Sequence, residues 1–271
     1  MRDEVAVITG AASGIGRHFA GEMVKQDYRL VLTDVDSGSL SAAFQESDGL
    51  ILCEHDIRDR DRWRSVLDEA RARFGRLDYL FNIAGVIEPA YSAEAVLDDV
   101  DLHMDTNAKG LMYGTLLACR LMTEQGSGHI VNVASLTGVA PMAGLDLYSA
   151  SKFAVRGFSL AAAHGLRETG VAVTVVCPDL VDTPMLTHQL DFDASALAFS
   201  GSRPLTVAEV SRALFRAMET RPMEIDLPRS RGWLAKIGNL APGLATVLTR
   251  TLTSKGLKTL GRLRRERAAA K

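Results

Sequence analysis

The chain has 271 residues, of which 47% are hydrophobic and 24% charged. Such a chain suits one large α/β domain with a substantial core and room for a terminal appendage. Its three cysteines lie far apart without a CxxC pair, and its six histidines show no ligand spacing, which argues against a disulfide framework and against any metal site. Buried, reduced thiols are expected.

The N-terminus has no basic segment followed by a long apolar core, so no secretory signal is expected. No window approaches the roughly 20 apolar residues that span a bilayer. These features predict a cytoplasmic protein, attached at most to a membrane surface.

Short apolar runs alternate with longer amphipathic ones along the chain. The short runs suit strands buried within a parallel sheet, at Val5–Thr9, Leu30–Thr33, Leu50–Cys53, Tyr79–Phe81, His129–Val133, Val171–Cys177 and Glu224–Leu227. The longer runs predict helices at Ile15–Lys25, Arg60–Phe74, Val96–Glu124, Tyr148–Glu168 and Val207–Glu219. The alternation predicts a doubly wound α/β fold, a Rossmann-like parallel sheet of about seven strands with helices on both faces.

A glycine-rich segment, Gly10-Ala11-Ala12-Ser13-Gly14-Ile15-Gly16, follows the first strand and opens the first helix. Glycines allow positive φ and a close approach of backbone to ligand, and a helix N-terminus offers free N–H groups to a pyrophosphate. Such a turn alone is a weak signal, but its place at a strand-to-helix junction favours dinucleotide binding.

Asp34 ends the second strand, 18 residues after Gly16. An acid there hydrogen-bonds the ribose hydroxyls and repels a 2′-phosphate. No Arg or Lys lies inside the glycine loop or directly after Asp34, so NAD is favoured over NADP. The alternative is that Asp34 only caps a turn.

Tyr148 and Lys152 stand at i and i+4 on one face of a helix. A neighbouring ammonium, together with the positive nicotinamide of an oxidised cofactor, would lower the pKa of the phenol and make it a usable acid/base. Ser135 follows a strand and would hold the substrate oxygen. An isolated Tyr-x-x-x-Lys pair is otherwise common on helix surfaces.

The motifs TGAASGIG at 9–16, NIAG at 82–85, TNAKG around Asn107, Ser135 and YSASK at 148–152 occur in this order. In order and spacing the chain resembles the short-chain dehydrogenases/reductases from about residue 4 to about residue 227. The resemblance implies a catalytic tetrad of Asn107, Ser135, Tyr148 and Lys152. Asn107, in a local helix distortion, would position a water that links Lys152 to bulk solvent.

The resemblance also implies cofactor contacts beyond the glycine loop and Asp34. Lys152 would bind the nicotinamide ribose beside Tyr148, and Thr183 would bond the carboxamide with Val181 next to it. Asp56 and Ile57 would contact adenine, whereas Asn82, Ala84 and Gly85 would stabilise the sheet and line the adenosine ribose side. Where the family usually has Pro-Gly, this chain has Pro178-Asp179. The Asp179 carboxylate is expected either near the nicotinamide ring, favouring its oxidised form, or turned to solvent.

The catalytic domain is expected at 1–228, with the family's variable substrate lid at about 182–204. Apolar lid residues predict a small hydrophobic, even lipid-like, substrate, unless they only pack the lid onto the body: Met185, Leu186, Leu190, Phe192, Leu197 and Phe199. His188 is the polar exception and is expected on the lid surface.

A basic, helix-like extension follows at 229–271. It contains 11 of the 31 Lys and Arg residues and a single acidic residue, Glu266. Its formal charge is therefore +10, whereas that of residues 1–228 is −12. Pro242, Gly243 and Gly256 are expected to divide it into two or three short helices. A cap on the acidic body or on a second subunit is favoured over peripheral membrane contact, and no nucleic acid partner is expected.

Together these features predict an NAD-dependent enzyme that interconverts a secondary alcohol and a ketone, with Tyr148 as acid/base. The alternatives are an NADPH-dependent ketoreductase, which Asp34 disfavours, and a non-catalytic cofactor-binding regulator, which would need neither Tyr148 nor Lys152. The resemblance further implies a homodimer or homotetramer formed through the two long helices.

Overall fold

The computed structural model of the protein describes residues 2–240 and 242–269. Its centre is a seven-stranded, all-parallel sheet in the order β3-β2-β1-β4-β5-β6-β7. The strands are β1 Val5–Thr9, β2 Arg29–Asp34, β3 Leu50–Glu54, β4 Tyr79–Asn82, β5 Gly128–Val133, β6 Val171–Pro178 and β7 Glu224–Leu227. Each predicted strand is present, and the chain crosses the sheet between β3 and β4, which confirms the doubly wound Rossmann-like fold.

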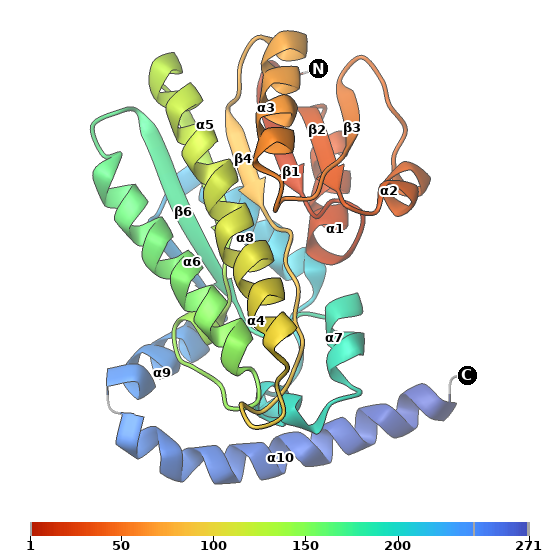
Figure 1. The fold of residues 1–271 in the computed structure, drawn as a ribbon, viewed down its shortest axis with the longest axis vertical. Coiled ribbons are helices and arrows are strands. Elements are labelled where there is room, and N and C mark those ends of the chain that lie inside the picture. The colour runs from red at the N-terminus through yellow and green to blue at the C-terminus, as the bar shows by residue number, and fades with distance from the viewer. Residues whose placement is uncertain (1, 241, 270–271) are drawn as a thin grey trace.

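Helices cover both faces of the sheet (Figure 1). On one face lie α3 (Arg60–Phe74), α5 (Leu111–Gln125) and α6 (Asp146–Gly165), and on the other α1 (Gly14–Lys25) and α8 (Val207–Thr220). Successive residues of β1 serve the two layers, since Ile8 packs with Phe19 and Leu214 whereas Val7 packs with Trp63. Burial on both faces explains why the strands are nearly continuous apolar runs.

The helices differ from the sequence prediction in two places. The short helix α2 (Ser37–Ala43) was not predicted; Asp36 caps it by accepting a hydrogen bond from the Ser39 backbone N–H. The predicted helix 96–124 is interrupted: α4 (Leu97–His103) passes into a π-helical turn at Met104–Gly110 before α5 begins. Asn107 therefore lies in a helix distortion, as the resemblance implied.

Two further elements lie at the end of the molecule where β6 terminates (Figure 1). The lid consists of α7 (Pro184–Gln189) and a 3-10 helix at Asp193–Ser200. The extension forms α9 (Arg229–Leu240) and α10 (Pro242–Ala269), and α10 packs along the lid 3-10 helix. Gly256 was expected to end a helix, but α10 runs through it.

Candidate active site

The glycine-rich loop lines a cavity of about 310 Å³ at the carboxyl ends of β1, β2 and β4. The lining includes eleven of the predicted cofactor residues, namely Gly10, Ser13, Gly14, Ile15, Gly16, Asp34, Asp56, Ile57, Ala84, Gly85 and Thr183. Asn82 does not line it: its amide bonds Asn132 Oδ1 at 2.8 Å and Thr115 Oγ1 at 3.1 Å within the sheet layer. Asn82 thus supports the sheet, one of the two roles that the resemblance implied.

Two glycines in the loop are required by geometry. Gly10 has a φ of +71°, and a Cβ there would lie 2.9 Å from the Ala84 backbone. A Cβ on Gly16 would lie 2.0 Å from the Gly10 carbonyl oxygen, so only glycine lets α1 approach the loop. The N-cap Ser13 makes no side-chain cap bond, which leaves the first N–H groups of α1 directed at the cavity. This cradle fits a pyrophosphate.

Asp34 has a structural task as well as its place in the cavity. Its carboxylate accepts hydrogen bonds from the backbone N–H of Ala12 at 2.9 Å and of Asp36 at 3.0 Å. The acid therefore ties the glycine loop to the end of β2. The same cavity holds one guanidinium, Arg58, which the sequence reasoning did not consider, but Asp56 pairs with it at 2.6 Å.

We expect the Asp34 carboxylate to set the choice between the two nicotinamide cofactors. Asp34→Asn removes its charge, and the ratio of kcat/KM for NADP over NAD is expected to rise about 10- to 100-fold, the equivalent of one charged hydrogen bond. Initial rates with each cofactor give the ratio. Asp36→Asn, the same change two residues on, is the control and should leave it unchanged; equal ratios in both variants would contradict the role of Asp34.

A second cavity, of about 100 Å³, joins the first, since Ile15, Ile83, Gly85, Thr183 and Met185 line both. Its wall contains Ser135, Tyr148, Lys152 and Val181. Tyr148 and Lys152 are buried on α6, and the Lys152 Nζ lies 5.6 Å from the centre of the Tyr148 ring. Three members of the predicted tetrad therefore meet in one small cavity next to the dinucleotide cradle.

Burial shifts the pKa of both groups of this pair. Burial raises the pKa of the Tyr148 phenol to about 12, opposed by a hydrogen bond with Ser135. Burial also lowers the pKa of the Lys152 ammonium to about 8, and Nζ donates to the Val133 carbonyl at 3.1 Å. In the protein without cofactor, burial thus dominates the pKa of Tyr148, and the predicted lowering by Lys152 together with the positive nicotinamide stays a prediction.

Asn107 is fully buried in the π-helical turn. Its Oδ1 accepts from the Val86 N–H at 2.8 Å, and its Nδ2 donates to the Val86 carbonyl at 2.9 Å and to Ser151 Oγ at 3.0 Å. A Cβ on Gly85 would lie 3.0 Å from Asn107 Oδ1 and 3.5 Å from Lys152 Nζ. Asn107 thus holds the loop after β4 against the catalytic helix.

His103 is a further buried group near the site that the sequence reasoning missed. Its ring lies 6.3 Å from the Tyr148 ring, centre to centre. Nδ1 contacts the Asp99 carbonyl at 2.7 Å and Nε2 accepts from the Glu88 N–H at 3.1 Å, which requires the neutral ring with its proton on Nδ1. Both nitrogens are engaged, so His103 fixes the loop after β4.

Asp179 lines the catalytic cavity but is not turned to solvent. Its carboxylate pairs with the Arg231 guanidinium of α9 at 2.6 Å, and its N–H bonds the Leu227 carbonyl at 2.8 Å. Burial raises the pKa of Asp179, and Arg231 opposes that rise. Its φ is not positive, so the turn does not need the family's glycine. The extension therefore supplies the counter-ion of an acid in the catalytic cavity.

Side chains of α10 hold the lid in place. Leu260 is fully buried against Leu190 and Phe199, and Leu263 packs beside them. Arg264 pairs with Asp193 at 2.8 Å and Arg267 with Asp191 at 3.1 Å. His188, half exposed as expected, bonds Glu88 at 2.9 Å and ties the lid to the loop after β4.

Within residues 2–240 and 242–269, no helix is both long and apolar enough to cross a membrane.

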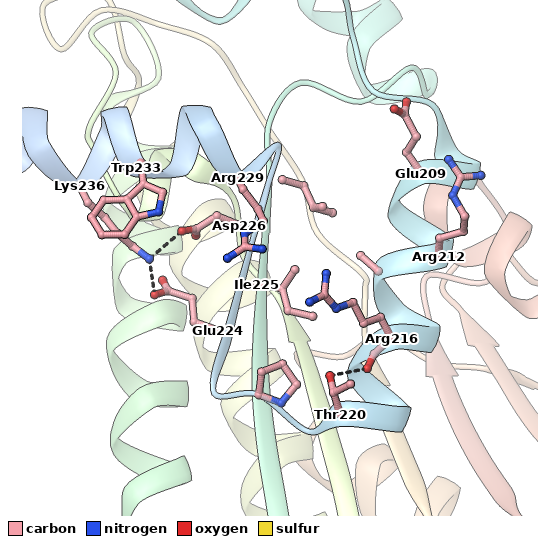
Figure 2. Close-up of a pocket in the computed structure, with 13 residues that line it drawn as sticks. Glu209, Arg212, Arg216, Thr220, Glu224, Ile225, Asp226, Arg229, Trp233 and Lys236 are labelled. Atoms are coloured by element: carbon pink, nitrogen blue, oxygen red, sulfur yellow. Dashed lines mark hydrogen bonds and ion pairs between the residues drawn. The ribbon is translucent and has the colours of Figure 1, made fainter.

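A larger groove, of about 520 Å³, lies away from these residues, between α8, β7 and α9 (Figure 2). Lys236 bonds both Glu224 and Asp226 there, at 2.7 and 2.6 Å. Those two carboxylates also lie close to Cys177, but Lys236 and Arg156 already neutralise them, so the cluster does not fit a metal ion. The three cysteines are free thiols, with Cys53 and Cys177 buried and Cys119 half-buried.

A dinucleotide cradle joined to a cavity with a serine and a buried Tyr–Lys pair defines a Rossmann-fold oxidoreductase. The sequence model of the short chain dehydrogenase family matches residues 4–193. An uncharacterised oxidoreductase of Staphylococcus saprophyticus is 33% identical over 190 residues, 68% of this chain and 81% of that protein. The chain belongs to the short-chain dehydrogenase family.

Solved structures of the same family agree with this assignment. A short-chain dehydrogenase/reductase from Burkholderia phymatum in complex with NAD has a TM-score of 0.78 and 27% identity, covering 90% of this chain and 97% of that one. The 3-ketoacyl-(acyl-carrier-protein) reductase from Brucella melitensis complexed with NADH has a TM-score of 0.73 and 26% identity, covering 82% and 96%. The coverage of the family model ends at residue 193, well before the extension.

Proposed function

We propose that the protein is an NAD-dependent oxidoreductase that interconverts a secondary alcohol and a ketone on a compact, largely apolar substrate. The observation that carries the proposal is the meeting of Ser135, Tyr148 and Lys152 in a cavity that joins the dinucleotide cradle. The wall around them is mainly apolar, with Ile87, Met142, Leu145 and Met185. A cavity of about 100 Å³ suits a small molecule better than an extended lipid chain.

Each residue of the site has a distinct role in this reaction. The glycine loop and Asp34 would hold the nicotinamide cofactor, which would supply the hydride acceptor for the alcohol and the hydride donor for the ketone. Ser135 hydrogen-bonds the substrate oxygen and orients it. Tyr148 takes the hydroxyl proton in oxidation and gives it back in reduction. Lys152 binds the nicotinamide ribose, and its charge, added to that of the oxidised nicotinamide, favours the Tyr148 phenolate.

NADH formation with a panel of small secondary alcohols, and NAD(P)H consumption with the matching ketones, tests the proposal. Turnover with NAD supports it, and turnover confined to NADPH and ketones supports the reductase alternative instead. Cofactor binding without any turnover across the panel would favour a regulator. The buried Tyr148 hydroxyl next to Ser135 speaks against that last alternative, because a protein that only binds the cofactor has no use for a proton-exchanging group in the adjoining cavity.

We also propose a homo-oligomer formed through α4 and α5. Four apolar side chains are exposed there, Val96, Leu97, Val100 and Leu116, with 85% of Leu97 accessible. Several exposed apolar side chains along one helical run are typical of a subunit contact. Light scattering on the eluting protein measures the mass, and a monomer would contradict the proposal.

The outer face of α9 supports a second proposal, contact with an anionic membrane surface. Trp233, Leu234, Ile237 and Leu240 are 58 to 86% exposed on this helix. Beside them, Arg212, Arg216 and Arg229 line the groove of Figure 2 and have no carboxylate partner within the described residues. Apolar anchors flanked by unpaired cations are the pattern of interfacial helices.

Flotation with vesicles tests this membrane contact. Wild type is expected to float with vesicles that contain phosphatidylserine and not with neutral phosphatidylcholine vesicles. Trp233→Ser combined with Ile237→Ser should abolish flotation, whereas Leu97→Ser, which removes an even more exposed apolar side chain from α4, should not. No flotation of wild type on anionic vesicles would rule out membrane contact and leave a capping role for the whole extension.

A further inference from the structure

The catalytic cavity contains a polar side chain that the proposed chemistry does not use. Gln189, the last residue of α7, is 4% exposed and lines the cavity with Ser135 and Tyr148. Its Nε2 makes one long hydrogen bond, 3.4 Å to the Met185 carbonyl one turn earlier in the same helix. Its Oε1 accepts no hydrogen bond from any residue that the structure describes. A buried amide is stable only when its donors and acceptor are paired.

Thr137 adds a second such group to the same wall. Its backbone N–H donates to Ser135 Oγ at 3.1 Å, so it helps to hold the serine. Its own hydroxyl is buried and has no partner within residues 2–240 and 242–269. Thr137 is 4% exposed and also lines the cavity. The fully buried Thr137 hydroxyl does not reach the cavity space, so Gln189 is the group that offers unsatisfied hydrogen bonds to a substrate there.

Among the described residues, no other side chain of the cavity wall hydrogen-bonds Gln189. Ile87, Met142, Leu145, Leu180 and Ala198 are apolar, and Asp179 is engaged with Arg231. A purely hydrocarbon substrate would displace water from Gln189 and leave the amide unpaired, at a cost of about 1–3 kcal/mol. A substrate with a suitably placed oxygen would instead form the missing hydrogen bond with the Gln189 amide.

We propose that Gln189 is a specificity-determining residue and that the substrate carries a second oxygen besides the reacting hydroxyl or carbonyl group. The inference rests on the proposed alcohol–ketone function of the same site. Ser135 and Tyr148 hold the reacting oxygen, and the Gln189 amide holds the second one. The substrate class is thus a small ether alcohol, diol or hydroxyketone and its oxidised counterpart.

The size of the cavity limits this class to compact molecules. Its volume, about 100 Å³, suits a molecule the size of one small ring and not a fused-ring or long-chain molecule. The lid that carries Gln189 is also tied down from two sides, by His188 to Glu88 and by Arg267 to Asp191. A long substrate would have to displace these contacts.

Matched ring alcohols test the role of Gln189. Cyclohexanol is compared with tetrahydropyran-4-ol and tetrahydropyran-3-ol, in which one ring methylene is replaced by an ether oxygen at nearly constant size. Wild type is expected to prefer at least one of the ethers by tenfold or more in kcat/KM. Gln189→Leu should remove that preference, by lowering kcat/KM for the ether and not for cyclohexanol.

His188→Leu is the matched control, since it makes a polar-to-apolar change at the neighbouring position, whose side chain bonds Glu88 and does not line the cavity. It should keep the preference for the ether. The inference is overturned if wild type shows no preference for either ether, or if Gln189→Leu changes kcat/KM by the same factor for the ether and the carbocycle, as a merely structural residue would.

Failure of the proposed function would be seen separately, as a lack of turnover by wild type with every alcohol and ketone. In that case saturation-transfer NMR of cyclohexanone and tetrahydropyran-4-one, with NADH present, measures binding alone. Selective binding of the ether ketone that Gln189→Leu abolishes would support the role of Gln189 without catalysis, and equal signals from both ketones would overturn it.

Discussion

Replacement of Tyr148 by Phe is expected to lower kcat/KM about 1000-fold, within the range for loss of a general acid/base. The ring stays in place and only the hydroxyl that exchanges the substrate proton is lost. NAD binding should change little, because the cradle is formed by the glycine loop and Asp34. Stability should fall by no more than about 1 kcal/mol, since the phenyl ring keeps the packing and loses only the hydrogen bond with Ser135.

The same assignment predicts the direction of the pH dependence. Alcohol oxidation needs the deprotonated phenol, and ketone reduction needs the protonated one. With the pKa of Tyr148 at about 12 in the protein alone, the phenol is protonated at neutral pH. The rate of oxidation should therefore rise with pH over the range in which the rate of reduction falls. In Tyr148→Phe both rates should be low and should no longer change with pH over that range.

Tyr113→Phe is the matched control for this experiment. Tyr113 is half-buried on α5, where its ring contacts Arg60 and lies outside both cavities. Its kcat/KM should stay within about twofold of wild type, as for substitutions away from functional features. Activity of Tyr148→Phe above one tenth of wild type would contradict the role of Tyr148 as acid/base.

The central sheet could be predicted from the sequence because its strands are buried on both faces. Val7 and Ile8 illustrate this, since they are adjacent and pack into opposite layers. Burial of both faces produces a dense apolar run that no surface strand would show. By contrast, α2 has the sequence SGSLSAA, with a single buried residue, Leu40. Its helix depends on the Asp36 cap more than on apolar periodicity, which explains why it was not predicted.

The positions of the cavity residues were also predictable where a motif carries them. Local geometry requires glycine at Gly10 and Gly16, and the chemistry requires the phenol of Tyr148, so each of these residues belongs to a recognisable sequence motif. Gln189, and Arg231 as the partner of Asp179, belong to no such motif. Their roles follow from how the lid and α9 dock on the body, and such contacts join residues with no common pattern.

The pKa of Tyr148 could not be predicted from the sequence, for a different physical reason. The i, i+4 spacing correctly placed Lys152 on the same face of α6 as the phenol. The spacing carries no information on desolvation, however, and both groups are almost completely buried. Burial acts on each pKa in the direction of the neutral form, which raises that of Tyr148 and lowers that of Lys152.

The extension shows how tertiary contact changes the meaning of a glycine. Gly256 was expected to break the helix because glycine is a poor helix former. In the structure a Cβ at this position would lie 1.7 Å from the Ala196 carbonyl oxygen, so Gly256 is where α10 meets the lid 3-10 helix backbone to backbone. The helix continues because its packing against the lid outweighs the propensity cost of one residue.

Gly256→Ala is therefore expected to push α10 away from the lid. The added methyl cannot fit without a shift of backbone, and the buried side chain of Leu260 and the Arg264–Asp193 pair lie one to two turns further along α10. Overpacking of this kind costs about 1–3 kcal/mol. Because the lid carries Gln189 and Met185 into the catalytic cavity, kcat/KM should fall about tenfold or more. Tryptic cleavage within residues 250–267 should become faster.

Gly261→Ala makes the same chemical change five residues further along the same helix and should have the opposite effect on stability. A Cβ there would meet only the end of the Arg265 side chain, at 3.8 Å. Without a clash, alanine gains the helix propensity that glycine lacks, about 1 kcal/mol, which corresponds to a rise in Tm of about 2–4 °C for a chain of this size. Thermal unfolding of both variants measures the contrast. If Gly256→Ala and Gly261→Ala stabilise the protein equally and leave kcat/KM unchanged, α10 does not hold the lid and has no part in shaping the substrate cavity.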